Sequence, residues 1–225
     1  MKLSAAIMAH PVRKAEAEST QAALDRPVDI VYDTNPVPSA DPAQRWATGV
    51  AAWEAHDPSA DWHLVIQDDA VPGQDLLAGL EAALDVLGPE GVVSAYTGTG
   101  RPNQPKVQAG LDRAKAGGHS WMCAERVYWG VAIVAPVETI PGMLAWCSSR
   151  KHAREKYDFR IGRYYREQLG WRAWYTVPSL VDHRDGKSLI GHGDVGRRAH
   201  QMLRGSALDV DWTRTPAEGL KVTFQ

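Results

Sequence analysis

The chain has 225 residues, which is enough for one sizeable α/β core and short for two. Its hydrophobic content of 44% and charged content of 23% are ordinary for a globular domain, and no apolar stretch approaches the roughly 20 residues of a membrane span. The net charge of −2 excludes the overall basic footprint of many nucleic-acid-binding proteins.

The charge is unevenly distributed along the chain. Residues 1–96 hold 5 Lys and Arg against 15 Asp and Glu, whereas residues 97–225 hold 20 against 12. An acidic half that holds a metal ion and a basic half that holds an anion would fit an enzyme of nucleotide diphosphates. Two merely solvated faces fit the same distribution.

The cysteines and the N-terminus indicate the compartment. Cys123 and Cys147 are the only cysteines and form no CxxC motif, so we expect reduced, partly buried thiols in a reducing compartment. Residues 3–9 are apolar but too few for the hydrophobic region of a secretory signal. We therefore expect a cytoplasmic protein without a membrane span.

The acidic half begins with alternating strands and helices. Residues 3–9 predict a short buried strand, residues 13–25 an Ala- and Glu-rich helix, and residues 28–33 a second strand. Such a β-α-β unit favours a parallel sheet. Asp41 then supplies a helix N-cap, followed by Pro42 at the first helical position.

Two further strands and a helix complete this half. Residues 63–67 predict a strand that runs directly into Asp68 and Asp69. Leucines recur at helical spacing over residues 76–87, which predicts an amphipathic helix. Residues 92–96 predict the next strand.

The basic half opens with residues 97–120, whose five Gly and two Pro we interpret as a long loop. Residues 127–135 predict a strand, and residues 138–149 and 157–169 predict helices. Residues 172–183 predict a last strand.

No repeat, low-complexity tract or linker divides the chain. We therefore expect one α/β domain over residues 1–205, with a mixed, mostly parallel sheet flanked by helices. Residues 206–225 are expected to form a C-terminal tail.

The strongest local signal is VIQDDAVP at residues 65–72, in which Asp68 and Asp69 follow an apolar strand. The carboxyl ends of strands border the ligand crevice in α/β sheets. Adjacent carboxylates repel each other and need a cation or donors nearby. Mg²⁺ or Mn²⁺ suits this place, because either ion binds to one or two carboxylates, water and phosphate oxygens. A chance pair or a helix N-cap is the alternative.

A second signal is PSLVDHRDGKSLIGH at residues 178–192. His183 can add a nitrogen ligand to the same cation, which would favour Mn²⁺ over Mg²⁺. Arg184 and Lys187 can neutralise a leaving diphosphate, and His192 is a further candidate ligand. The alternative is an exposed turn whose histidine has only a structural role.

Other candidate residues lie at the ends of predicted elements. Asp158 begins the helix predicted at residues 157–169, where an acid ordinarily caps a helix but can also deprotonate an acceptor hydroxyl as a general base. His10 and Arg13 follow the first strand, and Asp33 closes the second. A base, a ribose or a phosphate is commonly held from such positions.

Taken in order, these segments resemble a GT-A type glycosyltransferase. The matching pieces are the first strand with its AHPVR turn, the strand ending in Asp33, the helix with RWATGVAAW, VIQDDAVP in the place of the DxD motif, WGVAIVAP, the acid in KYDFR, and PSLVDHRDGKS. The resemblance spans roughly residues 1–200. It is strongest to small glycosyltransferases of actinobacterial phages, which would act in the host cytoplasm, and more distant to lipooligosaccharide and procollagen galactosyltransferases.

The resemblance implies a GT-A-like, Rossmann-related fold, a divalent metal ion and a nucleotide-sugar donor, in the first place a UDP-sugar. Asp69 matches the metal-binding last acid of the motif, with Asp68 near the ribose or the sugar. His183 matches the C-terminal metal-binding histidine, and Asp158 matches the catalytic base of inverting members. The sequence departs from a strict DxD motif at Gln67, which can hydrogen-bond a ribose hydroxyl but adds no charge.

The expected reaction is a direct displacement in which the metal ion at Asp69 and His183 offsets the charge of the departing nucleoside diphosphate. The candidate base Asp158 favours inversion, and a retaining mechanism stays open. Trp129, beside Gly130, can form an apolar wall for the sugar or the acceptor. We expect the acceptor to be a protein or a glycan rather than modified DNA, because the chain has no overall basic footprint.

Two other functions remain open. A nucleotidyltransferase that makes nucleotide sugars typically carries a Gly-rich phosphate loop after its first strand, whereas the turn here, AHPVRK, has no glycine. A non-catalytic carbohydrate- or protein-binding module is favoured only by Gln67, and the presence of Asp68, Asp69, Asp158 and His183 argues against it.

Overall fold

The structure is a computed structural model that describes residues 1–99, 104–184 and 198–214. Its strands are β1 (Leu3–Ala9), β2 (Asp29–Tyr32), β3 (Trp62–Gln67), β4 (Ala70–Pro72), β5 (Val92–Ser94), β6 (Trp121–Ala124), β7 (Ala132–Pro136), β8 (Ala173–Thr176) and β9 (Val181–His183). Its α-helices are α1 (Lys14–Ala22), α2 (Pro42–Glu54), α3 (Leu76–Leu87), α4 (Gln104–Ala116), α5 (Ile140–Cys147) and α6 (Tyr157–Leu169). Short 3-10 helices are η1 (Pro11–Arg13), η2 (Val137–Thr139) and η3 (Ala207–Asp209).

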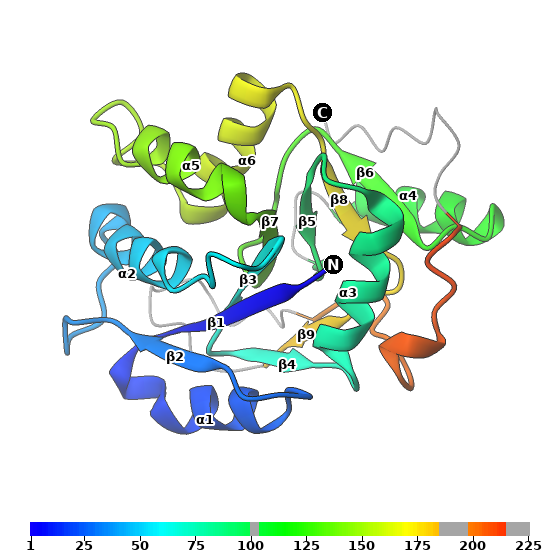
Figure 1. Cartoon of the computed structure of the whole chain (residues 1–225), viewed down its shortest axis with the longest axis horizontal. Coiled ribbons are helices and arrows are strands. Elements are labelled where there is room, and N and C mark those ends of the chain that lie inside the picture. The colour runs from blue at the N-terminus through cyan, green and yellow to red at the C-terminus, as the bar shows by residue number, and fades with distance from the viewer. Residues whose placement is uncertain (100–103, 185–197, 215–225) are drawn as a thin grey trace.

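The main sheet has seven strands in the order β2-β1-β3-β7-β5-β8-β6, and β4 pairs with β9 in a second, two-stranded sheet (Figure 1). In the main sheet β1, β2, β3, β5 and β8 run in one direction, and β7 and β6 run against them. The sheet is therefore mixed and mostly parallel, which confirms the predicted α/β fold.

The register of the three parallel strands fixes where their ends meet. Met8, near the end of β1, pairs with Val31 of β2 on one side and with Gln67 of β3 on the other. The residues that follow β1, β2 and β3 are therefore gathered at one edge of the sheet, as expected for parallel neighbours.

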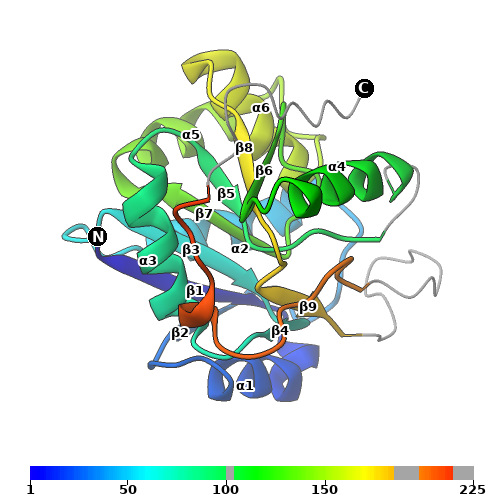
Figure 2. The same cartoon turned by 90° about the vertical axis from the view of Figure 1, so that its right-hand side faces the viewer.

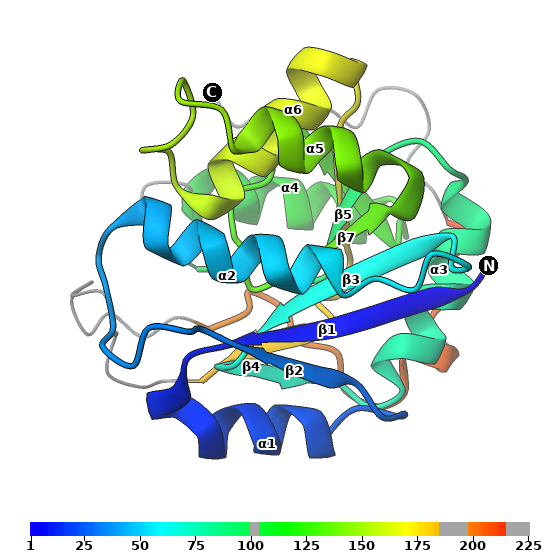
Figure 3. The same cartoon turned by 60° about the vertical axis from the view of Figure 1, so that its left-hand side comes forward.

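Helices cover both faces of the sheet (Figure 3). One core joins the sheet to α2, α4, α5 and α6, and a second core joins it to α1, α3 and η3. Val65 of β3 belongs to the first core, whereas its neighbours Leu64 and Ile66 belong to the second. This alternation follows from the two-residue period of a strand and explains why β3 is apolar throughout.

Two expectations drawn from composition can be compared with the structure. Cys123 and Cys147 are free thiols, and both are buried rather than partly buried. Across the described ranges, no helix combines the length and the apolar character needed to cross a membrane.

The prediction of a loop over residues 97–120 is wrong for most of that stretch. It contains α4 and is followed directly by β6, a strand that was not predicted. Val107, Leu111 and Ala114 recur at helical spacing on one side of α4 and are fully or almost fully buried. This apolar stripe outweighs the glycines and prolines on which the loop prediction rested.

Two predicted strands are also shorter than expected. The strand predicted at residues 127–135 begins only at Ala132. The run at residues 172–183 divides into β8 in the main sheet and β9 in the small sheet. Pro178 lies between them, and a proline has no N–H to continue a ladder of hydrogen bonds.

Residues 206–214, within the expected tail, pack onto the domain beside α3 (Figure 2). Trp212 and Ala207 are buried, and the Trp212 indole N–H donates to the Ala207 carbonyl at 3.2 Å. The Trp121 indole N–H in turn donates to the Trp212 carbonyl at 3.2 Å. A Cβ at Gly79 would lie 2.2 Å from the Ala207 Cβ, so only glycine permits this close approach of α3 and η3.

We predict that Trp212→Ala lowers the free energy of unfolding by about 3–5 kcal/mol, because it removes a large buried side chain and leaves a cavity. The matched control is Leu208→Ala four residues earlier, where the side chain is 56% exposed and the expected change is within about 0.5 kcal/mol. Urea unfolding curves of the full chain measure both. Equal midpoints for the two variants would contradict the anchoring of this segment.

Candidate active site

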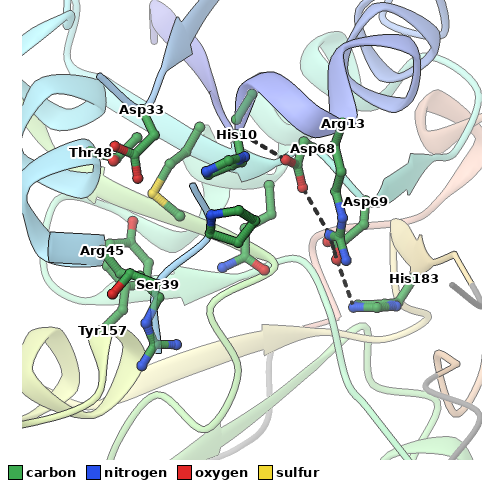
Figure 4. Close-up of a pocket in the computed structure, with 14 residues that line it drawn as sticks. His10, Arg13, Asp33, Ser39, Arg45, Thr48, Asp68, Asp69, Tyr157 and His183 are labelled. Atoms are coloured by element: carbon green, nitrogen blue, oxygen red, sulfur yellow. Dashed lines mark hydrogen bonds and ion pairs between the residues drawn. The ribbon is translucent and has the colours of Figure 1, made fainter. Parts of the chain in front are cut away.

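A pocket of about 180 Å³ lies at the edge where β1, β2 and β3 end (Figure 4). Its walls come from the ends of these strands, the loop before α2, the first turns of α2 and α6, and the end of β9. The lining residues are Met8, Ala9, His10, Arg13, Asp33, Pro38, Ser39, Arg45, Thr48, Gln67, Asp68, Asp69, Tyr157 and His183.

The two adjacent acids are held by the turn between β3 and β4. The Asp68 N–H donates to the Met8 carbonyl at 3.1 Å, which continues the β1–β3 ladder by one residue. The buried Thr20 hydroxyl of α1 lies 3.1 Å from the Asp68 carbonyl and 2.8 Å from that of Ala70. The backbone that carries both carboxylates is therefore fixed from two sides.

His183 reaches the acids through the small sheet. Because β4 pairs antiparallel with β9, Ala70 lies opposite His183, and the Arg184 N–H donates to the Asp69 carbonyl at 2.8 Å. The His183 Nε2 comes within 3.4 Å of the Asp69 Oδ2. The strand β4 is only three residues long and was not predicted, yet it brings together the two residues predicted as metal ligands.

The hydrogen bonds of these two side chains suit a cation. The His183 Nδ1 lies 2.7 Å from the Arg184 carbonyl, so in the neutral ring Nδ1 carries the proton and Nε2 presents its lone pair toward Asp69. The Asp69 Oδ1 is buried and has no hydrogen-bond partner among the described residues. The His183 Nε2 and the Asp69 carboxylate are thus two acceptors that face each other, and a positive charge between or beside them stabilises this arrangement.

The cation need not be held by protein alone. Within the described ranges, no group of three or more His, Cys, Asp or Glu side chains is placed to hold a metal ion. Asp69 and His183 would supply two ligands, and phosphate oxygens and water would supply the others. This division is usual for Mg²⁺ and related ions at phosphate sites, so the residues present fit such an ion.

Arg13 already neutralises the two acids in this arrangement. Its Nη1 lies 3.1 Å from the Asp68 Oδ1 and also contacts the Asp69 Oδ2. Burial disfavours the charge of Arg13, but the two carboxylates outweigh this effect and raise the pKa of its guanidinium. Burial and the neighbouring Asp69 raise the pKa of Asp68, while the His10 N–H and Arg13 act in the opposite direction.

The other end of the pocket offers a carboxylate, a guanidinium and two hydroxyl groups as hydrogen-bonding partners. Figure 4 shows Asp33, Ser39, Arg45 and Thr48 gathered at this end, with His10 between them and the acids. The His10 Nδ1 accepts from the Val12 N–H at 3.2 Å, so in the neutral ring Nε2 is a donor. That atom is buried without a hydrogen-bond partner in the described parts of the chain.

The structure brings together seven of the residues that the sequence predicts for the site. These are His10, Arg13, Asp33, Gln67, Asp68, Asp69 and His183. Lys187 and His192 lie outside the described residues. Trp129, Gly130, Asp158 and Arg184 are described but do not line this pocket.

Gly130 and Trp129 lie just behind the pocket wall. A Cβ on Gly130 would be 2.8 Å from the Tyr157 ring and 3.3 Å from the Gln67 Nε2, both of which belong to lining residues. The Trp129 ring packs edge-to-face on Tyr96 at 6.0 Å, and Tyr96 lies 6.4 Å from the His183 ring. Trp129 therefore supports His183 through Tyr96.

Arg184 and Asp158 each follow a lining residue in the chain, but neither lines the pocket itself. The Arg184 side chain turns away to α1, where it donates to the Ser19 hydroxyl at 2.8 Å. Asp158 is half-buried in the first turn of α6, next to the lining residue Tyr157. Burial raises the pKa of Asp158 to about 6, although the Phe159 N–H and nearby basic groups oppose the shift.

Ser39, Arg45, Thr48 and Tyr157 were not predicted as site residues. Arg45 and Thr48 are three residues apart on α2, so they share a helix face that borders the edge of the sheet. Thr48 is buried although polar, but burial cannot be read from one sequence. The Asp41 cap, which was predicted and accepts the Ala43 N–H at 2.9 Å, is the signal that places the start of this helix.

No protein-family model and no curated protein sequence matches this chain. It is similar to a glycosyltransferase involved in the glycosylation of the major capsid of PBCV-1, with a TM-score of 0.43 and 12% identity over 83% of this chain and 95% of that chain. It is also similar to mannose-1-phosphate geranyltransferase from Thermus thermophilus, with a TM-score of 0.35 and 14% identity over 78% of this chain and 74% of that chain. Likenesses this weak leave the function to be argued from the site itself.

We predict a pH-dependent stability contribution from Asp158. Because its pKa is raised on folding from 3.8 to about 6, the folded state keeps a proton that the unfolded state has lost. The stabilisation is therefore full below pH 3.8 and is lost as the pH rises through about 6, by about 1–3 kcal/mol. Urea unfolding from pH 4 to pH 7 should show this loss in the wild type relative to Asp158→Asn, and parallel stability curves would contradict it.

Proposed function

We propose that this chain is a metal-dependent glycosyltransferase that moves a sugar from a nucleotide-sugar donor, in the first place a UDP-sugar, to a hydroxyl group of a protein or glycan acceptor. The observation that carries the proposal is the meeting of Asp69 and His183, with the Nε2 lone pair directed at a carboxylate. A carboxylate and an imidazole nitrogen form a ligand set that Mn²⁺ accepts and that leaves room for phosphate oxygens.

The two ends of the pocket support a nucleoside diphosphate as the ligand. Arg13 and the predicted metal ligands lie at one end, where a diphosphate would be neutralised. Asp33 and Thr48 offer an acceptor and a hydroxyl at the other end, which suits the polar edges of a ribose and a base. The unpartnered His10 donor lies between the two ends, within the path that such a ligand would take.

The residues of the chain divide the proposed reaction between them. A bound divalent ion supplies electrostatic stabilisation of the departing diphosphate. Arg13 adds a second positive charge beside the same phosphates. Asp158 accepts the proton of the acceptor hydroxyl while the oxygen of that hydroxyl bonds to C1 of the sugar. The bond from C1 to the diphosphate breaks at the same time, and its electron pair leaves with the diphosphate, so the anomeric centre inverts.

A pKa near 6 suits Asp158 for this role. At neutral pH most of the carboxyl is ionised, and it is more basic than an exposed aspartate. Asp158 follows the lining residue Tyr157 at the start of α6, which supports a role beside the pocket rather than among the phosphate ligands. An acceptor hydroxyl that approaches C1 of the sugar from the α6 side would meet it there.

The products separate this proposal from the two rival functions. A glycosyltransferase releases a nucleoside diphosphate from a nucleotide sugar, whereas a nucleotidyltransferase exchanges pyrophosphate with it. A binding module releases neither product. Incubation of the purified chain with UDP-sugars, Mn²⁺ and either an acceptor glycan or pyrophosphate distinguishes the three. In the first assay Asp158→Asn should lower turnover by about 10²–10⁴-fold.

We predict that one nucleotide among UDP, GDP, ADP and CMP raises the melting temperature of the wild type only when Mn²⁺ is present. At a ligand concentration of about 100 Kd the stabilisation is about 2.7 kcal/mol. For a chain of this length, that corresponds to about 5–10 °C. Asp69→Asn and His183→Ala should abolish the Mn²⁺-dependent part of the shift.

His119→Ala is the matched control for these two variants, because His119 does not line the pocket and should leave the shift unchanged. If no nucleotide raises the melting temperature of the wild type, with or without Mn²⁺, the proposed function is wrong. A melting-temperature shift that survives in both Asp69→Asn and His183→Ala would mean that the nucleotide binds but that Asp69 and His183 do not hold the metal ion.

A further inference from the structure

Arg13 occupies the oxygen of Asp69 that a metal ion would need. The Asp69 Oδ2 is the atom that lies 3.4 Å from the His183 Nε2, and it is the same atom that the Arg13 Nη1 contacts. A cation bound by both Asp69 and His183 would sit against this oxygen. The guanidinium and the cation therefore compete for one carboxylate.

The two acids are not equivalent in this competition. The Asp68 Oδ2 accepts the His10 N–H at 2.9 Å and its Oδ1 accepts from Arg13 at 3.1 Å, so both oxygens of Asp68 are engaged. The Asp69 Oδ1, by contrast, is buried without a hydrogen-bond partner among the described residues. Asp68 is thus the fixed partner of Arg13, and Asp69 is the partner that can be exchanged.

Entry of a divalent ion would place a double positive charge beside the guanidinium. The Arg13 side chain is only 15% exposed, so solvent screens this repulsion incompletely. If Arg13 keeps its bond to Asp68 and turns away from Asp69, another anion can take the place of the Asp69 carboxylate beside the guanidinium. A diphosphate bound by the same ion is an anion of the right charge in the right place.

We propose that Arg13 makes metal binding and diphosphate binding depend on each other. When a metal ion arrives alone, Arg13 blocks its access to the Asp69 carboxylate. When the metal ion and the diphosphate arrive together, Arg13 keeps its contact with Asp68 and turns from Asp69 to the diphosphate. This inference rests on the proposed function, since it takes the metal and diphosphate site as given. It concerns the order and coupling of binding, which the ligand set by itself does not determine.

The experiment measures Mn²⁺ binding to the full chain by electron paramagnetic resonance of free Mn²⁺, with and without UDP or GDP. In the wild type we expect the nucleotide to tighten Mn²⁺ binding by about tenfold or more. In Arg13→Gln we expect Mn²⁺ alone to bind about tenfold tighter than to the wild type, and the tightening by nucleotide to fall below about threefold. Because coupling is reciprocal, calorimetric titration of the nucleotide with and without Mn²⁺ must give the same factor.

Lys14→Gln is the matched control, because it removes the same charge from the next residue, whose side chain is 69% exposed and pairs with Glu18. It should behave as the wild type does. Arg13→Lys keeps the charge and serves if Arg13→Gln does not fold; an ammonium is more strongly hydrated than a guanidinium and suits a buried ion pair less well, so Mn²⁺ alone should bind more tightly than to the wild type.

The outcomes separate this inference from the proposed function. If the wild type binds Mn²⁺ and nucleotide with a coupling that Arg13→Gln and Arg13→Lys leave unchanged, the role of Arg13 is wrong while the proposed function stands. If either variant weakens the binding of Mn²⁺ alone, Arg13 is not a competitor and the inference is overturned. If the wild type binds neither Mn²⁺ nor a nucleotide, both the inference and the proposed function fail.

Discussion

Two carboxylates on adjacent residues at the end of a buried strand repel each other, and the groups that surround them in the pocket offset that repulsion. Asp68 and Asp69 cannot move apart, because the ladder of β3 and the Thr20 hydroxyl hold their backbone. Positive charge and hydrogen-bond donors must therefore come to them. Arg13 and the His10 N–H come from the turn after β1. His183, from the distant strand β9, adds a second acceptor beside Asp69, and this pair of acceptors suits a cation.

The fold supplies these partners in two ways. The parallel register of β1, β2 and β3 brings the residues after each strand to one edge, so that Arg13, Asp33 and Asp68 share a pocket. The small β4–β9 sheet then adds a residue from late in the chain. Trp129 and Tyr96 pack behind His183 and limit its movement. A ligand that carries negative charge would thus meet a site whose geometry is largely set before it binds.

The sequence predicts the parts of this arrangement that depend on local pattern. The strand ending in Asp68 and Asp69 and the capped start of α2 are confirmed because apolar runs and capping residues act over a few neighbours. The loop predicted over residues 97–120 is wrong for most of that stretch, because the buried stripe of Val107, Leu111 and Ala114 outweighs the glycines and prolines there.

Contacts between segments that are far apart in the chain could not be predicted from the sequence. The approach of His183 to Asp69 depends on the pairing of β4 with β9, two strands of three residues with no distinctive pattern. The placement of Arg45 and Thr48 in the pocket depends on how α2 packs. The roles of Asp69, His183 and Asp158 were assigned through resemblance to a family, and they remain proposals that the geometry supports.

Diffraction from crystals grown with Mn²⁺ and UDP, with anomalous data collected at the manganese edge, tests the central claim most directly. The account predicts one manganese peak about 2.1 Å from both the Asp69 carboxylate and the His183 Nε2, with the diphosphate completing its ligands and Arg13 turned from Asp69 to a phosphate oxygen. Nucleotide density in the pocket without a manganese peak at Asp69 and His183, or a peak held by other residues, would contradict it.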